Sequence, residues 1–387
     1  MIIHTVKKGE NIFSIARKYA VSPIKIIENN CLPYPDRLIP GQMLLILIPT
    51  RTYIVRGGDT VSKLCRRFDI KKRALIANNP SLHGHQILHA GTELVIRYDA
   101  PSYGILTING YVYETTSADR FWTMLPYLTY VTFCGQNEHT EEWTCAVKKE
   151  RKIPLLRLNR KEIYEKYKKD PTGFFAEAEQ VKKMGYGGIT LSAASLGVGD
   201  DVAGRFLLEI KKQLLGMDML LFQETKAEFE EEYADAADGI VALYEKCHKQ
   251  EIPSFDEGEI SVLQRFSERM ETGKAFLELS AFGYDGEKAL TIEQILKIAI
   301  KYGAEIENDA ERKTSHLDYI LYRNGEKKPL RISFESMENI KAKLELVHEF
   351  GFLGAAVDIG RIPISYVMML HNLFASVEQP YVKIFNA

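Results

Sequence analysis

HTVKKGENIFSIARKY (residues 4–19) and YIVRGGDTVSKLCRRF (residues 53–68) align along their whole length, so the chain opens with two copies of one motif. Gly9 aligns with Gly58 and Ile12 with Val61, and an Asn-Asn pair follows both stretches. A sequence that recurs at a fixed period of a few tens of residues forms one structural unit per copy. We therefore expect two small modules of the same fold at the N-terminus.

Each copy is predicted to fold as strand, helix, helix, strand. In the first copy the strand is Ile3–Val6, and Asn11 caps a helix whose apolar residues recur at helical spacing. Pro23 suits the first position of the second helix, and Met43–Ile48 forms the closing strand. The second copy follows the same plan and closes with Leu94–Ile96.

The glycine turn after the first strand, the Asn-Asn pair and the Pro-Gly or Ala-Gly turn before the last strand resemble the LysM domain in both copies. This resemblance implies binding of the N-acetylglucosamine backbone of peptidoglycan or chitin in a shallow groove between two loops. Alternatively, the loop glycines only turn the backbone. Two linked grooves would raise avidity, because the second engagement becomes intramolecular. The implied groove positions are Gly9, Glu10, Asn11, Ile12, Leu38, Ile39 and Pro40 in module 1–49, and Gly58, Asp59, Thr60, Val61, Ile87, Leu88, His89 and Ala90 in module 50–98.

Past Pro101, short apolar runs alternate with amphipathic helical patterns. Eight strands separated by helices close a (β/α)₈ barrel, which we predict for residues 102–387. An open, doubly wound sheet is the alternative, although no G-x-G-x-x-G follows the first run. Strand-like segments within about 285–340 predict a small α+β insertion before the last run. The eight runs are Tyr103–Asn109, Leu128–Cys134, Ile153–Asn159, Gly187–Ser192, Asp218–Gln223, Gly239–Tyr244, Ala275–Ala281 and Leu353–Asp358.

GYGGITLSAA (residues 185–194), SAFGYD (280–285) and GAAVDIG (354–360) resemble the strand ends of glycoside hydrolase family 18. With the two LysM-like modules, the order of domains is similar to that of spore-cortex-lytic N-acetylglucosaminidases. The family's fourth strand ends in D-G-x-x-x-D-x-E, whose last Glu protonates the leaving oxygen. The three acid positions correspond here to Gly187, Ser192 and Ala194, none of which carries a carboxyl group.

The resemblance therefore implies a barrel that has lost the family's catalytic acid. A positioned general acid contributes roughly 10²–10⁴-fold to rate, and alanine has no proton to give. Tyr244 and Tyr284 keep family positions in the cleft, whereas Val357 stands where the family has the tryptophan floor of a sugar subsite. We expect no hydrolysis by the family mechanism.

Acids elsewhere on the barrel rim provide the rival interpretation. Glu224, Glu245 and Asp285 follow the fifth, sixth and seventh runs, and active sites of this fold lie at the C-terminal ends of the strands. A relocated pair such as Glu224 with Glu245 would make the protein an active cell-wall or spore-cortex N-acetylglucosaminidase. Ser195, in A-x-S-x-G after the fourth run, is a weak match to a hydrolase nucleophile, since no spacing identifies a histidine partner.

Charge is distributed unevenly along the chain. Residues 1–98 carry 15 Lys and Arg against 6 Asp and Glu, whereas the remainder carries 35 against 46. A basic front favours an anionic partner, with nucleic acid, acidic lipid and peptidoglycan carboxylates as candidates, unless the charges are simply solvated. The front lacks aromatic residues interleaved with basic ones, so we expect no nucleic-acid partner.

Composition also limits cofactors and location. Five cysteines occur without a C-x-x-C pair and the nine histidines show no metal-ligand spacing, so we expect no disulfide framework, metal or cofactor. No stretch is apolar for the roughly 20 residues needed to span a membrane. MIIHTVKKGE lacks the pattern of a signal peptide, so we expect synthesis in the cytoplasm without one.

The sequence thus predicts a peptidoglycan-binding protein with an inactive family 18-like barrel. The modules anchor the chain to glycan, and the barrel serves as a scaffold, a weak sugar cleft or a docking surface for a protein partner. The resemblance implies a place in the spore coat or cortex, or at the cell wall. An active glycosidase with relocated acids is the alternative.

Overall fold

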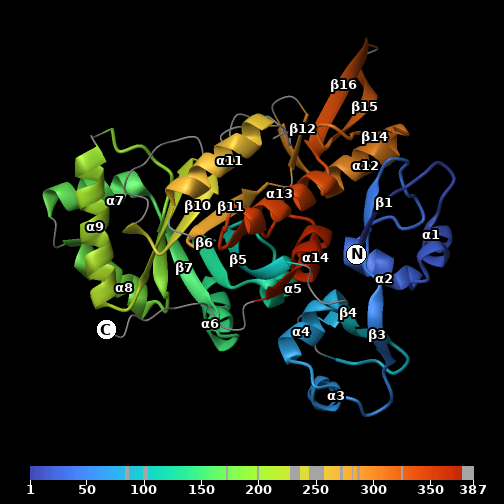
Figure 1. Ribbon diagram of the computed structural model, residues 1–387, viewed down its shortest axis with the longest axis horizontal. Coiled ribbons are helices and arrows are strands. Elements are labelled where there is room, and N and C mark those ends of the chain that lie inside the picture. The colour runs from blue at the N-terminus through green and yellow to red at the C-terminus, as the bar shows by residue number, and fades with distance from the viewer. Residues whose placement is uncertain are drawn as a thin grey trace.

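The computed structural model describes residues 1–82, 87–98, 103–170, 173–197, 200–226, 236–243, 257–270, 273–280, 282–285, 288–323 and 326–376. Two N-terminal βααβ modules precede a parallel barrel with outer helices, and an antiparallel sheet is inserted near the end of the barrel (Figure 1). The predicted fold class is confirmed.

Each N-terminal module pairs its first and last strands antiparallel and packs two helices beside them. Asn11 caps the first helix by accepting hydrogen bonds from the N–H groups of Phe13 and Ser14, and Thr60 caps the equivalent helix of the second module. Pro23 stands in the first turn of its helix, where its missing N–H leaves no bond unmade. The first module consists of β1 (Ile2–Thr5), α1 (Ile12–Tyr19), α2 (Pro23–Asn30) and β2 (Met43–Ile46). The second consists of β3 (Pro49–Ile54), α3 (Val61–Phe68), α4 (Lys72–Ala77), η1 (Pro80–Leu82) and β4 (Glu93–Tyr98).

Within the described residues, eight parallel strands form the barrel. They are β5 (Tyr103–Tyr113), β6 (Tyr130–Cys134), β7 (Ile153–Leu158), β8 (Gly188–Leu191), β9 (Leu220–Lys226), β10 (Gly239–Leu243), β11 (Ala275–Leu279) and β17 (Gly354–Asp358). Each strand pairs with the next, and β17 pairs with both β11 and β5, which closes the sheet. A further short strand, β18 (Phe374–Ser376), pairs with the N-terminal half of β5.

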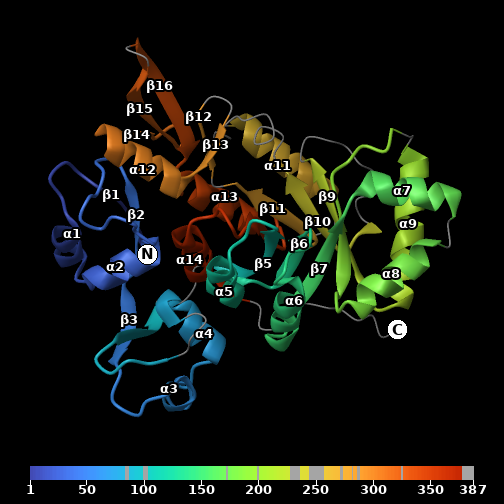
Figure 2. The same cartoon turned by 180° about the vertical axis from the view of Figure 1, so that it is seen from behind.

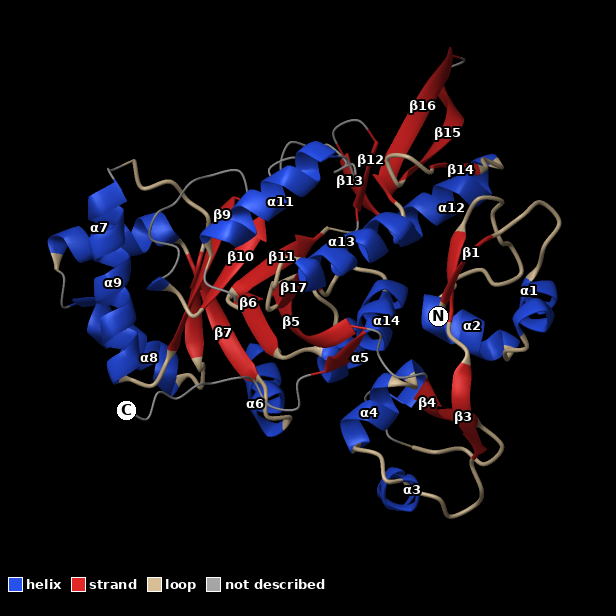
Figure 3. Ribbon diagram, viewed as in Figure 1, coloured by secondary structure: helices blue, strands red, loops and turns tan. Residues whose placement is uncertain are grey.

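Side chains along each barrel strand point alternately into the barrel and out toward the helices, and this alternation produces two apolar layers. Inward residues fill the barrel with a core that includes Tyr130, Leu155, Phe222 and Phe276, and outward residues pack under the helices. Helices surround the strands (Figure 3). They are α5 (Ala118–Met124), η2 (Leu125–Tyr127), α6 (Thr140–Lys149), α7 (Arg160–Lys169), α8 (Gly173–Lys183), α9 (Asp200–Gly216), α11 (Glu257–Arg269), α13 (Met337–Glu349) and α14 (Ile364–Leu373).

The insertion runs from Phe282 to Glu335, close to the predicted 285–340. Its sheet has the order β13-β12-β16-β15-β14 and packs against α12, with a core that includes Ile295, Leu317 and Ile332. The β15–β16 hairpin projects from the body (Figure 1). The elements are β12 (Phe282–Asp285), β13 (Lys288–Thr291), α12 (Ile292–Tyr302), β14 (Ile306–Asp309), β15 (Thr314–Arg323) and β16 (Glu326–Glu335).

Both N-terminal modules are docked on the same side of the barrel (Figure 2). In the first module, α2 and β2 contact α14. In the second, Arg73 of α4 donates hydrogen bonds to the carbonyl oxygens of Pro126 (2.7 Å) and Leu128 (2.9 Å), and the Tyr127 hydroxyl donates to Ala77 O (2.7 Å). Among the helices of the described ranges, none combines the length and the apolar character needed to cross a bilayer.

Candidate functional site

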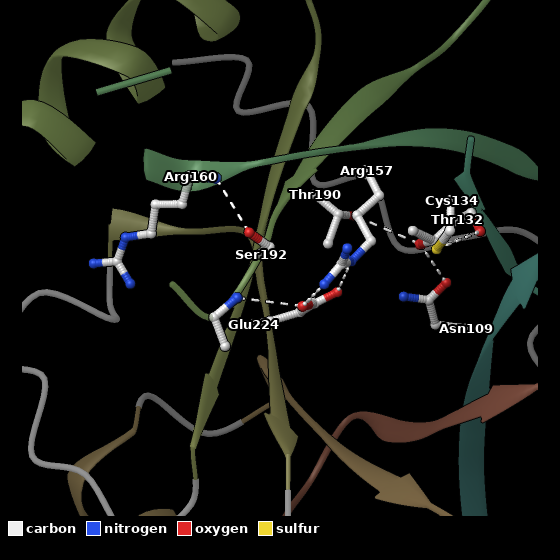
Figure 4. Close-up of polar contacts among 9 residues, drawn as sticks. Asn109, Thr132, Cys134, Arg157, Arg160, Thr190, Ser192 and Glu224 are labelled. Carbon is white, nitrogen blue, oxygen red and sulfur yellow. Dashed lines mark hydrogen bonds and ion pairs between the residues drawn. The ribbon is translucent and has the colours of Figure 1, made fainter. Parts of the chain in front are cut away.

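Strand β8 and the residue after it, Ser192, present two hydroxyl side chains at the barrel mouth (Figure 4). Thr190 Oγ1 lies 3.5 Å from Thr132 Oγ1, and the Thr132 hydroxyl donates to Asn109 Oδ1 (2.9 Å). Ser192 Oγ accepts the N–H of Arg160 (3.2 Å). Both hydroxyl groups contact other groups of the protein, and neither threonine nor serine is a strong acid or base.

The other two positions that correspond to family acids lie beyond the ends of β8. Gly187 precedes the strand and donates its N–H to Pro154 O (2.8 Å). Ala194 follows the strand, and its N–H donates to the carbonyl oxygen of Ser192 (2.8 Å). This strand therefore brings no carboxyl group to the mouth.

The strands on either side of β8 each contribute one member of an ion pair. Arg157 of β7 donates from Nε to Glu224 Oε1 (2.7 Å) and from Nη2 to Oε2 (2.8 Å), and Oε2 also accepts the N–H of Ala193 (3.3 Å). The Glu224 side chain is 2% exposed. Hydrogen bonding to Glu224 raises the pKa of Arg157. Both oxygens of the Glu224 carboxylate are therefore occupied by hydrogen bonds to the guanidinium.

A cavity of about 70 Å³ lies at this mouth. Ligand sites enclose about 300–1,000 Å³, so the space between the described residues is smaller than a typical ligand site. The lining residues are Tyr111, Tyr113, Arg157, Glu224, Val241, Leu243, Glu278, Ala356, Val357 and Asp358.

Two acids of the cavity, Glu278 and Asp358, were not predicted. Burial raises the pKa of Asp358, although Arg361 (Nε to Oδ2, 3.5 Å) and the N–H of Gly360 (2.9 Å) oppose this shift. The sequence did contain a signal, because Asp358 ends the eighth run and Glu278 alternates with the inward Phe276.

The remaining predicted barrel residues are distributed differently from expectation. Asp285 and Tyr284 lie in β12 of the insertion rather than at the cavity, and Asp285 Oδ2 accepts the Tyr319 hydroxyl (3.2 Å). Val357 borders the cavity, but its side chain belongs to the core between barrel and helices. Tyr244 and Glu245 lie outside the described residues, so the pair of Glu224 with Glu245 stays a prediction.

In each N-terminal module an acidic side chain shapes the first loop. The Glu10 carboxylate accepts the N–H of Lys7 (2.8 Å), and the Asp59 carboxylate accepts the N–H of Arg56 (2.8 Å). These backbone hydrogen bonds lower the pKa of both acids. The loop acids therefore stabilise the turn.

The other first-loop positions have structural roles that match between the modules. The two loop glycines adopt left-handed φ angles of +85° and +82°, where a side chain would be strained. The two apolar positions are buried in the module cores rather than lining a groove. The matched pairs are Gly9 with Gly58, Asn11 with Thr60 as helix caps, and Ile12 with Val61 in the cores.

The second loops differ sharply between the modules. Ile39 is buried in the core of the insertion, and Leu38 and Pro40 are partly buried. In the second module Ile87 is 64% exposed, and His89 and Ala90 are also exposed, whereas Leu88 is partly buried.

The LysM domain family matches residues 4–47 and 53–97, which are the two modules described above. The two N-terminal modules are LysM domains. We refer to them as LysM1 and LysM2. The cell wall-binding protein YocH of Bacillus subtilis (strain 168) is 30% identical over 110 residues, which cover 27% of this chain and 37% of YocH.

The whole chain, including the LysM pair, has relatives of the same organisation. YdhD of Bacillus subtilis (strain 168), by name a sporulation-specific glycosylase, is 20% identical over 398 residues, covering 90% of this chain and 93% of YdhD. The crystal structure of the spore cortex-lytic enzyme SleL of Bacillus megaterium QM B1551 superposes with a TM-score of 0.70 at 20% identity, covering 97% of this chain and 99% of SleL. The barrel is therefore like that of family 18 glycoside hydrolases.

Proposed function

We propose that this protein binds peptidoglycan through a LysM domain and that its barrel does not hydrolyse glycosidic bonds. The LysM matches and the basic charge of residues 1–98 support the binding. The names of YdhD and SleL refer to sporulation and the spore cortex, and they support a location at the spore or the cell wall.

One observation carries the non-catalytic half of the proposal. None of the three positions that align with the family acids carries a carboxyl group, and the nearest replacement, Glu224, accepts hydrogen bonds from Arg157 on both oxygens. Glycoside hydrolysis needs a carboxylic acid to protonate the leaving oxygen. A small cavity and an engaged carboxylate support a barrel that acts as a scaffold.

The test measures new reducing ends released from spore-cortex and vegetative peptidoglycan by the full chain. We expect the same signal as from heat-inactivated protein, beside an active cortex-lytic glucosaminidase as positive control. Variants Asp358→Asn and Glu278→Gln locate any activity, because both acids line the cavity. Sustained release that one of these variants abolishes would overturn the non-catalytic proposal.

Binding is tested by sedimentation of the full chain with insoluble peptidoglycan at low salt and at about 0.5 M salt, where charge attraction between exposed groups is largely screened. We expect retention at both salt concentrations, because a LysM groove recognises the sugar backbone. Complete release at high salt would mean that general charge attraction, and not recognition of the sugar backbone, holds the protein on peptidoglycan. This result would contradict the proposal.

A further inference from the structure

The backbone hydrogen bonds of the two LysM domains establish which residues correspond in their second loops. Gly41 N donates to Val6 O (2.8 Å), and Gly91 N donates to Val55 O (2.9 Å). The pairs Pro40-Gly41 and Ala90-Gly91 are therefore structurally equivalent, and the residue before each pair is Ile39 in LysM1 and His89 in LysM2. Differences at these positions reflect the surroundings of the domains and not a shift in register.

In LysM1 the second loop is covered by β14 of the insertion. The N–H of Ile306 donates to Pro40 O (2.9 Å), and Asn308 Nδ2 donates to Gly41 O (2.8 Å). Ile39 packs into the core of the insertion together with Ile306. A Cβ placed on Gly41 would lie 1.8 Å from the carbonyl oxygen of Ile306, so the two backbones are in direct contact.

The same segment of the insertion also reaches the first loop of LysM1. Lys8 Nζ lies 3.6 Å from Glu305 Oε1, in an exposed ion pair. Such a pair contributes little to stability, but it places residues 305–308 next to both loops that would line a glycan groove. The residues that a sugar would contact on the second loop are already engaged with protein.

The second loop of LysM2 is open. A Cβ placed on Gly91 would have no atom within 4 Å, in contrast to the equivalent Gly41. Ile87 and His89 are exposed on this loop, and Arg56 is exposed at the start of the first loop. LysM2 is attached to the barrel through α4, where Arg73 donates hydrogen bonds to backbone carbonyls near η2.

We infer that LysM2 provides the glycan-binding groove of this chain and that LysM1 is an intramolecular docking domain whose groove is closed by the insertion. This inference rests on the proposed binding of peptidoglycan. A glycan entering LysM1 would have to expose Ile39 and Ile306 and break two hydrogen bonds, whereas LysM2 needs no rearrangement. The avidity expected from two linked grooves is therefore absent within one chain.

The experiment compares matched surface variants of the full chain on insoluble peptidoglycan. Arg56→Glu with Ile87→Glu changes LysM2, and Lys7→Glu with Phe13→Glu changes LysM1; all four side chains are exposed, so folding should be retained. We expect the LysM2 variant to lose about tenfold or more in affinity, as truncation of central contacts does. The LysM1 variant should stay within about twofold of the wild type. Unchanged melting temperatures verify the fold.

Calorimetric titration with a soluble N-acetylglucosamine oligomer gives an independent readout. We expect one oligomer bound per chain, and none bound to the LysM2 variant. Two oligomers per chain, or an equal loss of affinity in the LysM1 variant, would overturn the assignment to LysM2 while leaving peptidoglycan binding intact. A wild-type chain that binds neither peptidoglycan nor the oligomer would overturn the proposed function itself, and this inference with it.

Discussion

The guanidinium of Arg157 in β7 and the carboxylate of Glu224 in β9 form two parallel hydrogen bonds, of 2.7 Å and 2.8 Å, at the end of the intervening strand β8 (Figure 4). Strand β8 carries Thr190 at an inward position, and Ser192 follows directly after it. The charges of the ion pair thus neutralise each other at the end of β8. Arg157 thus binds both carboxylate oxygens of Glu224, which is the most buried acid lining the described cavity.

Replacing Arg157 tests this relationship. In Arg157→Met the buried Glu224 keeps only the N–H of Ala193 as a partner, and breaking a buried ion pair in this way costs about 3–5 kcal/mol. Solvent partly screens this pair, because Arg157 is 35% exposed. We therefore expect a loss at the lower end of this range, about 3 kcal/mol in the free energy of unfolding, measured by urea denaturation. The double variant Arg157→Met with Glu224→Met should recover most of the lost free energy of unfolding, because it leaves no unpaired charge. Equal losses in the single and double variants would show that packing, and not the unpaired charge, dominates.

Local patterns accounted for much of the fold, because strand alternation and helix caps are encoded within a few residues. Asn11 caps α1, and the run that contains Thr190 forms β8, as the sequence indicates. The ion pair of Arg157 with Glu224 depends on the register between strands 67 residues apart in the chain, which no local pattern specifies. The insertion likewise carries Asp285 away from the rim.

The same limit explains why the LysM repeat predicted two equivalent grooves. Ile39 and His89 occupy matching positions, and nothing in the repeat itself distinguishes their surroundings. The closure of LysM1 arises from β14, some 265 residues further along the chain, whose carbonyl at Ile306 approaches Gly41. Tertiary contacts of this kind decide which of two similar modules is accessible.

Substitutions at the two equivalent glycines measure the contact between LysM1 and the insertion. Gly41 and Gly91 have φ angles of +86° and +89°, so alanine should strain both by about 1–2 kcal/mol. Only Gly41→Ala also collides with the carbonyl of Ile306, and we expect it to lower the free energy of unfolding by roughly 2 kcal/mol more than Gly91→Ala. Hydrogen exchange at the Ile306 amide should accelerate in Gly41→Ala alone. Equal free energies of unfolding for Gly41→Ala and Gly91→Ala would mean that LysM1 and the insertion are not in close contact in solution.

Introducing acids at two of the positions that the family resemblance assigns to them tests whether missing acids alone account for the proposed inactivity of the barrel. We expect Ser192→Asp with Ala194→Glu to release no reducing ends above the heat-inactivated control. The described cavity of about 70 Å³ is smaller than a typical ligand site of about 300–1,000 Å³, so we expect it to hold a glycan unit poorly even with the new acids in place. Measurable release by this variant would mean that the mouth opens readily and that only the acids are missing.

The pH dependence of stability should carry a contribution from His371, whose ring packs edge-on against Tyr127 (centroids 5.6 Å apart). Burial, aided by the nearby charge of Arg73, lowers the pKa of His371 to about 4, whereas an unfolded histidine has a pKa of about 6.5. Between these values the unfolded state binds more protons. The stabilisation is therefore complete above about pH 6.5 and is lost as the pH falls toward 4.

Between pH 7 and pH 5 we expect His371 to account for a decrease of about 1–2 kcal/mol in the free energy of unfolding, since one pH unit corresponds to at most about 1.4 kcal/mol for one proton. Urea denaturation at both pH values measures it. His371→Gln should flatten this part of the pH dependence, whereas His348→Gln, at an exposed histidine, should keep the slope of the wild type. A slope that His371→Gln leaves unchanged would mean that His371 is charged in the folded protein at pH 5. In that case the packing of His371 against Tyr127 tolerates the imidazolium.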